Sequence, residues 1–140
     1  MRRVVYSGLV PCPPRRLAAD FLDERAAPDI WPALGRRTVL RSGSNWFEAA
    51  TPELGGVPGR PAVRFRRTRP TEVIAASTGR GAVVHHRFLP AKGGCLWVIE
   101  SHEERRRGES WTQFARRRGR ARQALEDLVD GAAAHFAARA

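Results

Sequence analysis

Two adjacent histidines, His85 and His86, lie in the apolar, β-branched stretch AVVHHRFL at residues 82–89. Histidine is the side chain whose ordinary pKa best suits proton transfer or metal binding near neutral pH. Neighbouring residues of a strand point to opposite faces of a sheet, so the two rings cannot serve one site or chelate one metal ion. The chemistry of this stretch therefore depends on which ring points inward, and the surrounding elements decide that.

The remaining histidines and the two cysteines do not extend this pair into a metal site. His102 and His135 stand alone, and the spacing of Cys12 and Cys95 matches no zinc motif. We therefore expect no metal ion.

The hydrophobic pattern predicts one strand, two short helices, six further strands and a long final helix. Alternating, β-branched segments predict strands at 4–10, 37–42, 45–51, 61–68, 71–78, 81–89 and 95–103. Helical spacing predicts helices at 15–26, 27–34 and 109–139. Short, turn-like connections between the last six strands favour antiparallel neighbours. We expect an α+β fold, with a curved seven-stranded antiparallel sheet wrapped around the C-terminal helix in a single domain of residues 1–140.

The net charge of the chain is +11, and every basic residue except Lys92 is an arginine. Abundant Arg, Ala, Gly and Pro also match the bias of GC-rich codons, so codon bias is an alternative to function as the source of part of the excess. The charge favours acidic partners, but the arginines are dispersed and no recognition module appears, so a dedicated nucleic-acid role is not expected. No apolar run approaches the roughly 20 residues that span a bilayer, and we expect a cytoplasmic protein.

Four strings occur in an informative order along the chain. They are VPCPPRRLAADFL at 10–22, IWP at 30–32, RRTRPTEVIAAS at 66–77 and RFLPAKGGCLWVIE at 87–100. Together they resemble the START-like helix-grip superfamily, which includes polyketide cyclase/dehydrase and birch-pollen-allergen-like proteins. The resemblance implies a ligand cavity between the sheet and the C-terminal helix. It leaves the activity open, because the superfamily holds cyclases, aromatases, lipid carriers, hormone receptors and chaperone activators.

Strand alternation predicts which side chains face this cavity. Val10 and Phe88 serve as inward anchors, which puts Tyr6 and His86 inside and His85 outside. A slip of one residue in register would exchange the two histidines. Ser101 faces inward by the same alternation. The other expected lining residues are Trp97, Ile99, Phe88, Val84, Ala75, Ser77, Phe65, Trp111 and Phe114.

Two functions fit such a cavity. The first is a cofactor-independent cyclase or dehydratase of specialised metabolism, acting on a polyketide-like or aromatic substrate. In it His86 transfers a proton, Tyr6 donates to an enolate oxygen and Ser101 orients either a carbonyl or His86 itself. The second is a non-catalytic carrier or sensor of a hydrophobic ligand, in which His86 is a buried ring bonded to a polar neighbour. The sequence leaves both open.

Three surface or packing questions complete the expectations. The arginine-rich run of the last helix is either a solvated face or a docking strip for an acidic acyl carrier protein, formed by Arg116, Arg117, Arg118, Arg120 and Arg122. We expect Phe65 inside and Arg64 outside, and a reversed bulge would make Arg64 a carboxylate partner in the cavity. If the last strand pairs with the first, Cys95 lies near Cys12, and both thiols stay free in a reducing cytoplasm.

Overall fold

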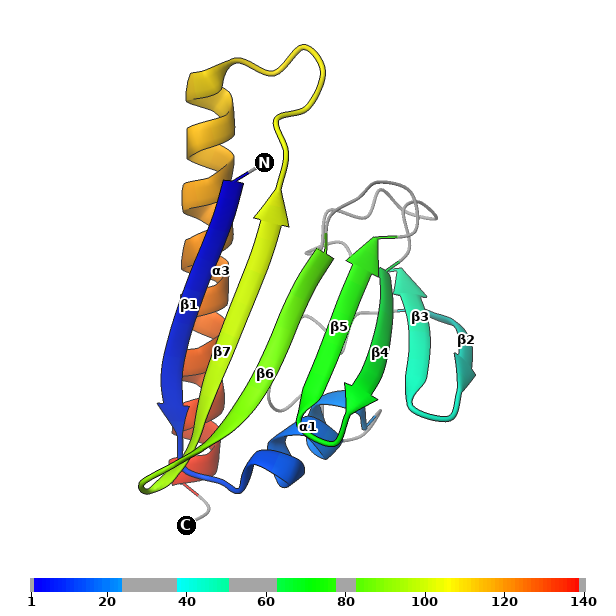
Figure 1. The fold of residues 1–140 in the computed structure, drawn as a ribbon, viewed down its shortest axis with the longest axis vertical. Helices are drawn as coiled ribbons and strands as arrows, with labels where there is room; N and C mark the ends of the chain where they lie inside the picture. Colours follow the sequence, from blue (N-terminus) through cyan, green and yellow to red (C-terminus); the bar gives the residue numbers. More distant parts are fainter. Residues whose placement is uncertain (1, 24–37, 51–62, 78–82, 139–140) are drawn as a thin grey trace.

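The computed structural model describes residues 2–23, 38–50, 63–77 and 83–138 (Figure 1). These residues begin with strand β1 (Arg2–Val10) and helix α1 (Pro14–Leu22), and they end with helix α3 (Trp111–Ala137). Between the helices lie β2 (Thr38–Gly43), β3 (Trp46–Ala50), β4 (Val63–Arg69), β5 (Glu72–Ser77), β6 (Val83–Ala91) and β7 (Gly94–Glu103). The predicted helix at 27–34 lies outside the described residues.

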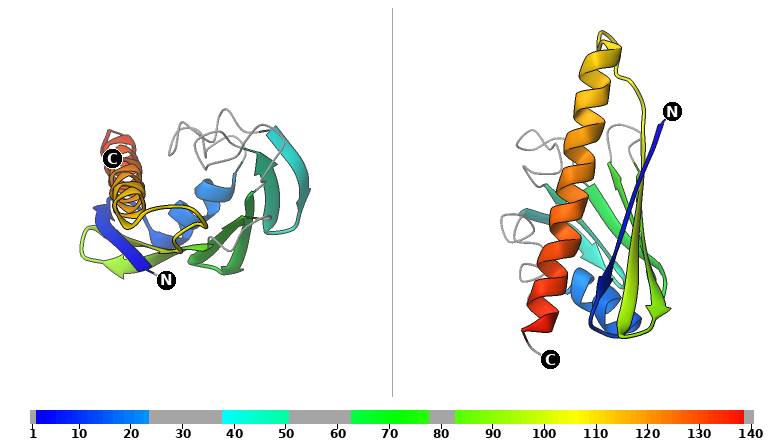
Figure 2. Two further views of the ribbon diagram at one scale, coloured as in Figure 1. Left: turned by 90° about the horizontal axis from the view of Figure 1, so that it is seen from above. Right: turned by 90° about the vertical axis from the view of Figure 1, so that its left-hand side faces the viewer.

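All seven strands belong to one antiparallel sheet with the order β1-β7-β6-β5-β4-β3-β2. The first and last strands are therefore neighbours. The sheet curves, and both α1 and α3 lie on its concave side (Figure 2). Helix α3 runs along β1 and β7, whereas β2 and β3 curl toward the opposite end. This is the α+β helix-grip fold that the sequence predicts.

The hairpin between β6 and β7 requires glycine. Gly94 has a φ of +149°, and a Cβ atom added there would clash with the backbone oxygen of Val10. A side chain would therefore push the hairpin away from the end of β1. Gly94 of the Gly-Gly turn thus allows the start of β7 to lie close to the end of β1.

Helix α1 closes one end of the concave face. Pro14 stands in its first turn, where its missing N–H leaves no helical bond unmade. Leu17, Ala18 and Phe21 are fully buried. The ring of Phe21 lies edge-on to that of Trp97, with 5.7 Å between the ring centroids. Burial of this apolar face is what fixes the helix against the sheet.

Helix α3 begins with a capping box. Ser110 Oγ accepts a hydrogen bond from the backbone N–H of Gln113 (3.1 Å), and the Gln113 side chain accepts one from the backbone N–H of Ser110 (2.8 Å). Further along, the helix lies directly on β1, because a Cβ atom added to Gly8 would sit 2.6 Å from Cγ1 of Val129. The buried stripe of the helix consists of Phe114, Leu128, Val129, Ala132 and Phe136. No helix in the described ranges has the length and apolarity needed to cross a membrane.

Candidate ligand-binding site

The strand register arranges the inward side chains in rows that cross the sheet. The row nearest the end where β7 finishes contains Val4, Ser101, Val84 and Ala75, and we call it the upper row. Below it comes a middle row of Tyr6, Ile99, His86 and Val73, then a lower row of Gly8, Trp97 and Phe88. The upper row continues into Phe65 of β4 and Phe47 of β3, so its smaller side chains are confined to β1, β7, β6 and β5.

The lower part of the concave face is filled by packed rings. Trp97, Phe88 and Phe21 are all 0% exposed. The centroid of the Phe88 ring lies 5.4 Å from that of Trp97. Phe65 extends this packing toward β3, where its ring stacks on Phe47 at 4.8 Å between centroids. These residues form the core and leave a ligand little room among them.

His86 is on the inward face, and His85 is on the outward one. The His86 ring is 2% exposed. Trp97 Nε1 donates to His86 Nδ1 at 3.2 Å, which assigns the ring proton of the neutral form to Nε2. The Phe21 ring covers His86 at 4.9 Å between centroids. Burial, with a smaller contribution from His85, lowers the pKa of His86 to about 3, so the ring is neutral at neutral pH.

Several apolar side chains at the edge of the core are only partly buried. Tyr6, Val84 and Leu125 are partly buried and pack against the edge of the core. Ala121, one turn before Leu125, is also partly buried. Apolar side chains of β1, β6 and α3 are therefore only partly covered at the edge of the core.

Two carboxylates on α3 approach Tyr6, and sequence reasoning did not find them. Burial raises the pKa of the Tyr6 phenol, and the nearby charges of Asp130 and Glu126 add to that rise. The Asp130 carboxylate also acts on the phenol as a hydrogen-bond acceptor would, which raises the pKa of Tyr6 further. Only the spacing of the long helix hinted at this pair, because both residues lie on a flank of its apolar stripe.

The other predicted lining residues fall into three groups. Ser101 is 3% exposed in the upper row, and Ala75 and Phe114 are also buried. Ser77 ends β5, and its side chain lies outside the described part of the chain. Trp111 departs from expectation: it is 66% exposed and lies under the guanidinium of Arg105, whose Cζ is 4.6 Å from its ring centroid. The start of α3 extends beyond the ends of β1 and β7 (Figure 1).

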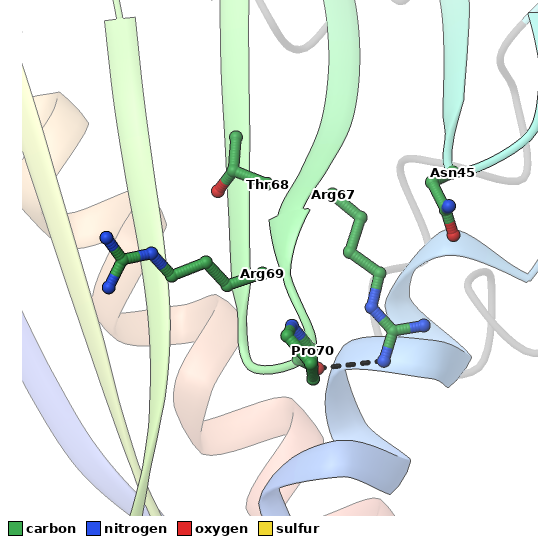
Figure 3. Close-up of a pocket in the computed structure, with 5 residues that line it drawn as sticks. All are labelled: Asn45, Arg67, Thr68, Arg69 and Pro70. Carbon is green, nitrogen blue, oxygen red and sulfur yellow. Dashed lines mark hydrogen bonds between the residues drawn. The ribbon is translucent and has the colours of Figure 1, made fainter.

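Two open pockets lie elsewhere on the described surface. One, of about 380 Å³, lies at the β4–β5 turn and is lined by Asn45, Arg67, Thr68, Arg69 and Pro70 (Figure 3). Arg67 Nη2 donates to the backbone oxygen of Pro70 there, at 2.8 Å. The other, of about 510 Å³, is lined by Arg69, Thr71, Glu72, His85, Arg87 and Leu89. The arginines around Pro70 were the signal for both pockets in the sequence, and Arg67 in the first lies on the same face of β4 as Phe65.

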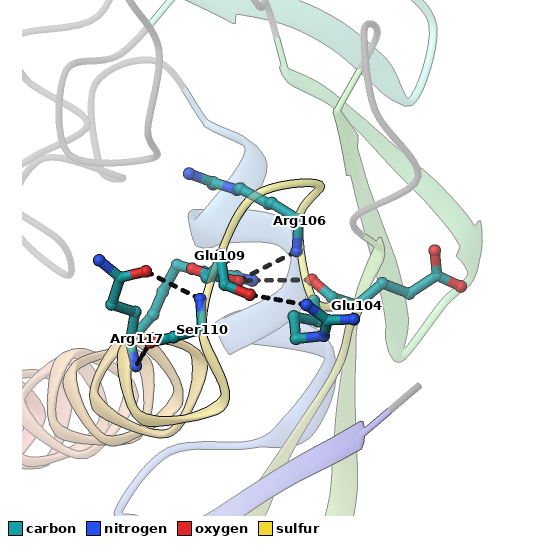
Figure 4. Close-up of polar contacts among 7 residues, drawn as sticks. Glu104, Arg106, Glu109, Ser110 and Arg117 are labelled. Carbon is teal, nitrogen blue, oxygen red and sulfur yellow. Dashed lines mark hydrogen bonds and ion pairs between the residues drawn. The ribbon is translucent and has the colours of Figure 1, made fainter.

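The arginines of α3 are not equivalent. Arg117 is engaged by Glu109, with Nε–Oε2 and Nη2–Oε1 distances of 3.0 Å, and it also donates to the backbone oxygen of Glu104 at 2.7 Å (Figure 4). The hydrogen bond from Arg117 and another from the Arg106 backbone lower the pKa of Glu109 to about 2. This network ties the segment before α3 to the helix. Arg116 is exposed, whereas Arg118 is partly buried.

On the convex side, Arg64 faces away from the interior as expected. Its Nε donates to Glu48 at 2.8 Å, and its Cζ lies 4.9 Å from the Trp46 ring centroid. Phe65, beside it, is fully buried.

Cys12 and Cys95 are buried free thiols. Cys95 pairs with Val10 in the sheet, which brings it close to Cys12 as predicted. Burial raises the pKa of Cys12 to about 11 and that of Cys95 to about 12. Within the described ranges, no group of three His, Cys, Asp or Glu side chains is placed to hold a metal ion.

No protein-family model matches this sequence, and no curated protein does so either. Solved structures share its fold. Protein BH1534 from Bacillus halodurans has a TM-score of 0.67 and 10% identity, covering 97% of each chain. TTHA0849 from Thermus thermophilus has a TM-score of 0.66 and 14% identity, covering 99% of each chain. Protein Ms6760 from Mycobacterium smegmatis has a TM-score of 0.66 and 12% identity, covering 99% of this chain and 92% of that one. Identities this low show the fold alone.

Proposed function

We propose that this protein binds a small hydrophobic or aromatic molecule between the concave face of the sheet and helix α3. The observation that carries the proposal is the group of partly buried apolar residues Tyr6, Val84 and Leu125 at the edge of the core. Val84 stands in the upper row between Ser101 and Ala75, two smaller side chains. Apolar walls with a few placed polar groups are typical of small-molecule sites.

The state of His86 favours a carrier or sensor over a cyclase or dehydratase. A general base works best when its pKa lies near the working pH, and the pKa of His86 is about 3. Its Nδ1 is already occupied by Trp97 Nε1–H. Catalysis by His86 with Tyr6 and Ser101 stays a prediction; the feature that supports it is the Asp130 carboxylate near the Tyr6 phenol, which raises the pKa of that phenol.

Docking of an acidic acyl carrier protein is a further part of the proposal. Arg116, Arg120 and Arg122 are exposed on α3 and support it. Arg117 supports it less, because Glu109 already holds its guanidinium. The two buried free thiols suit a reducing compartment and support a cytoplasmic location.

Filling the site with a larger side chain tests the binding proposal. Val84→Trp adds an indole on the concave face and should weaken binding of the neutral fluorescent probe N-phenyl-1-naphthylamine by about tenfold or more. The readout is probe fluorescence in a titration.

Val98→Trp is the matched control. Val98 is half-buried on the convex face of β7, so the same substitution there should leave probe affinity unchanged. Equal affinities for the wild type and both variants would place the probe elsewhere and remove the support for this site.

A further inference from the structure

We propose that Arg118 makes this site selective for hydrophobic molecules that carry a carboxylate group. The inference rests on the proposed function, because it names the class of ligand that the same site takes. It concerns one side chain of α3 whose surroundings differ from those of its neighbouring arginines.

Arg118 lies on the inward stripe of α3. At 3.6 residues per turn, it shares a face with Phe114, four residues earlier, and with Leu125, seven residues later. Phe114 is 2% exposed and Leu125 packs on the core, so this face is the buried one. Arg118 therefore places a permanent positive charge against the buried Phe114 ring, and it is partly buried there.

The guanidinium of Arg118 lacks an acceptor at one of its donors. Its Nε atom is enclosed and has no hydrogen-bond partner. Its Cζ lies 5.0 Å from the ring centroid of Phe114. Arg117 lies against the same ring, at 5.1 Å, but there Glu109 supplies the counter-charge.

An enclosed donor without an acceptor is unfavourable, so the arrangement suits a ligand that brings the acceptor. A carboxylate matches the planar fork of a guanidinium and takes two parallel hydrogen bonds from it. Leu125 lies about 10 Å further along the helix axis. A carboxylate on Arg118 would therefore leave the hydrocarbon body of the ligand to cover Leu125, Val84 and Tyr6.

The test compares two ligands that differ only in the head group. Decanoate and decan-1-ol are used at pH 8 to displace N-phenyl-1-naphthylamine from the wild type, from Arg118→Gln and from Arg15→Gln. Arg15 is an exposed arginine of α1, so its substitution removes the same charge away from the site. We expect Arg118→Gln to weaken decanoate binding by about tenfold and to leave decanol and probe affinities within about twofold. Arg15→Gln should match the wild type with all three.

The outcomes separate the inference from the function beneath it. If the probe binds but Arg118→Gln and Arg15→Gln behave alike, or if decanol loses as much affinity as decanoate, the inference is overturned and the binding function stands. If the probe fails to bind the wild type, both fall. A second variant, Arg118→Met, controls for a folding defect. It should have a higher melting temperature than the wild type, because the enclosed donor is gone, and it should still bind decanoate more weakly. A marked fall in its melting temperature would assign Arg118 a structural role instead.

Discussion

At the scale of single residues, His86 couples the stability of the fold to pH. Its pKa falls from 6.5 to about 3, first because of burial and then because of the nearby His85. Between these two values the unfolded chain binds a proton that the folded chain does not. The contribution of His86 to stability is therefore complete above pH 6.5 and is lost as the pH falls from about 6.5 toward 3.

His86→Gln removes this titration while retaining an acceptor for Trp97 Nε1. We expect the free energy of unfolding of the wild type to fall, relative to the variant, by up to about 1.4 kcal/mol per pH unit below about pH 6. Urea unfolding of both proteins between about pH 7.5 and about pH 4.5 measures the difference. Parallel pH curves would mean that His86 is accessible to protons in the folded state.

Sequence reasoning reached the orientation of His86 but not its partner. Period-two alternation is a local property, so one inward anchor per strand was enough to separate His86 from His85. The bond from Trp97 depends on side-chain rotamers, and the cover from Phe21 depends on where α1 docks. Neither follows from the spacing of residues along the chain.

At the scale of elements, the placement of α3 depends on one close approach to β1. An added Cβ atom at Gly8 would lie 2.6 Å from Cγ1 of Val129, closer than two carbon atoms can approach without displacement. Val129 is β-branched and buried, so its side chain has few other rotamers to adopt. The helix itself would have to move.

Gly8→Ala should therefore lower the free energy of unfolding by about 1–3 kcal/mol through overpacking. Val129→Ala removes the opposing methyl groups, so the double variant should lose less than the sum of the two single variants. Chemical denaturation of the four proteins completes the cycle. Strict additivity would show that α3 does not rest on Gly8.

The helical period predicted the extent of α3 closely but misplaced its first turn. Apolar spacing places Trp111 on the same helix as Phe114, and both were expected to line the interior. The structure buries Phe114 and leaves Trp111 66% exposed. Periodicity gives the face of a helix but not where the sheet beneath it ends.

At the scale of the whole molecule, local signals were enough to predict the seven strands and the antiparallel pairing of consecutive strands from β2 to β7, but not the pairing of β1 with β7. Turns rich in Gly and Pro separate short alternating segments, and each short connection restricts how the two strands that it joins can pair. How the concave face is filled was not predictable in this way. Rings from α1, β6 and β7 pack its lower part, whereas partly buried residues of β1, β6 and α3 adjoin the upper row. This division depends on where α1 docks on the concave face of the sheet.

The most direct test of the account is an amide chemical-shift map of the protein titrated with N-phenyl-1-naphthylamine. A ligand between the sheet and α3 should shift the amides of Tyr6, Val84 and Ser101 together with those of Ala121 and Leu125. Shifts gathered at His85, Arg87 and Leu89 on the convex face, or no saturable shifts, would contradict a binding site on the concave face.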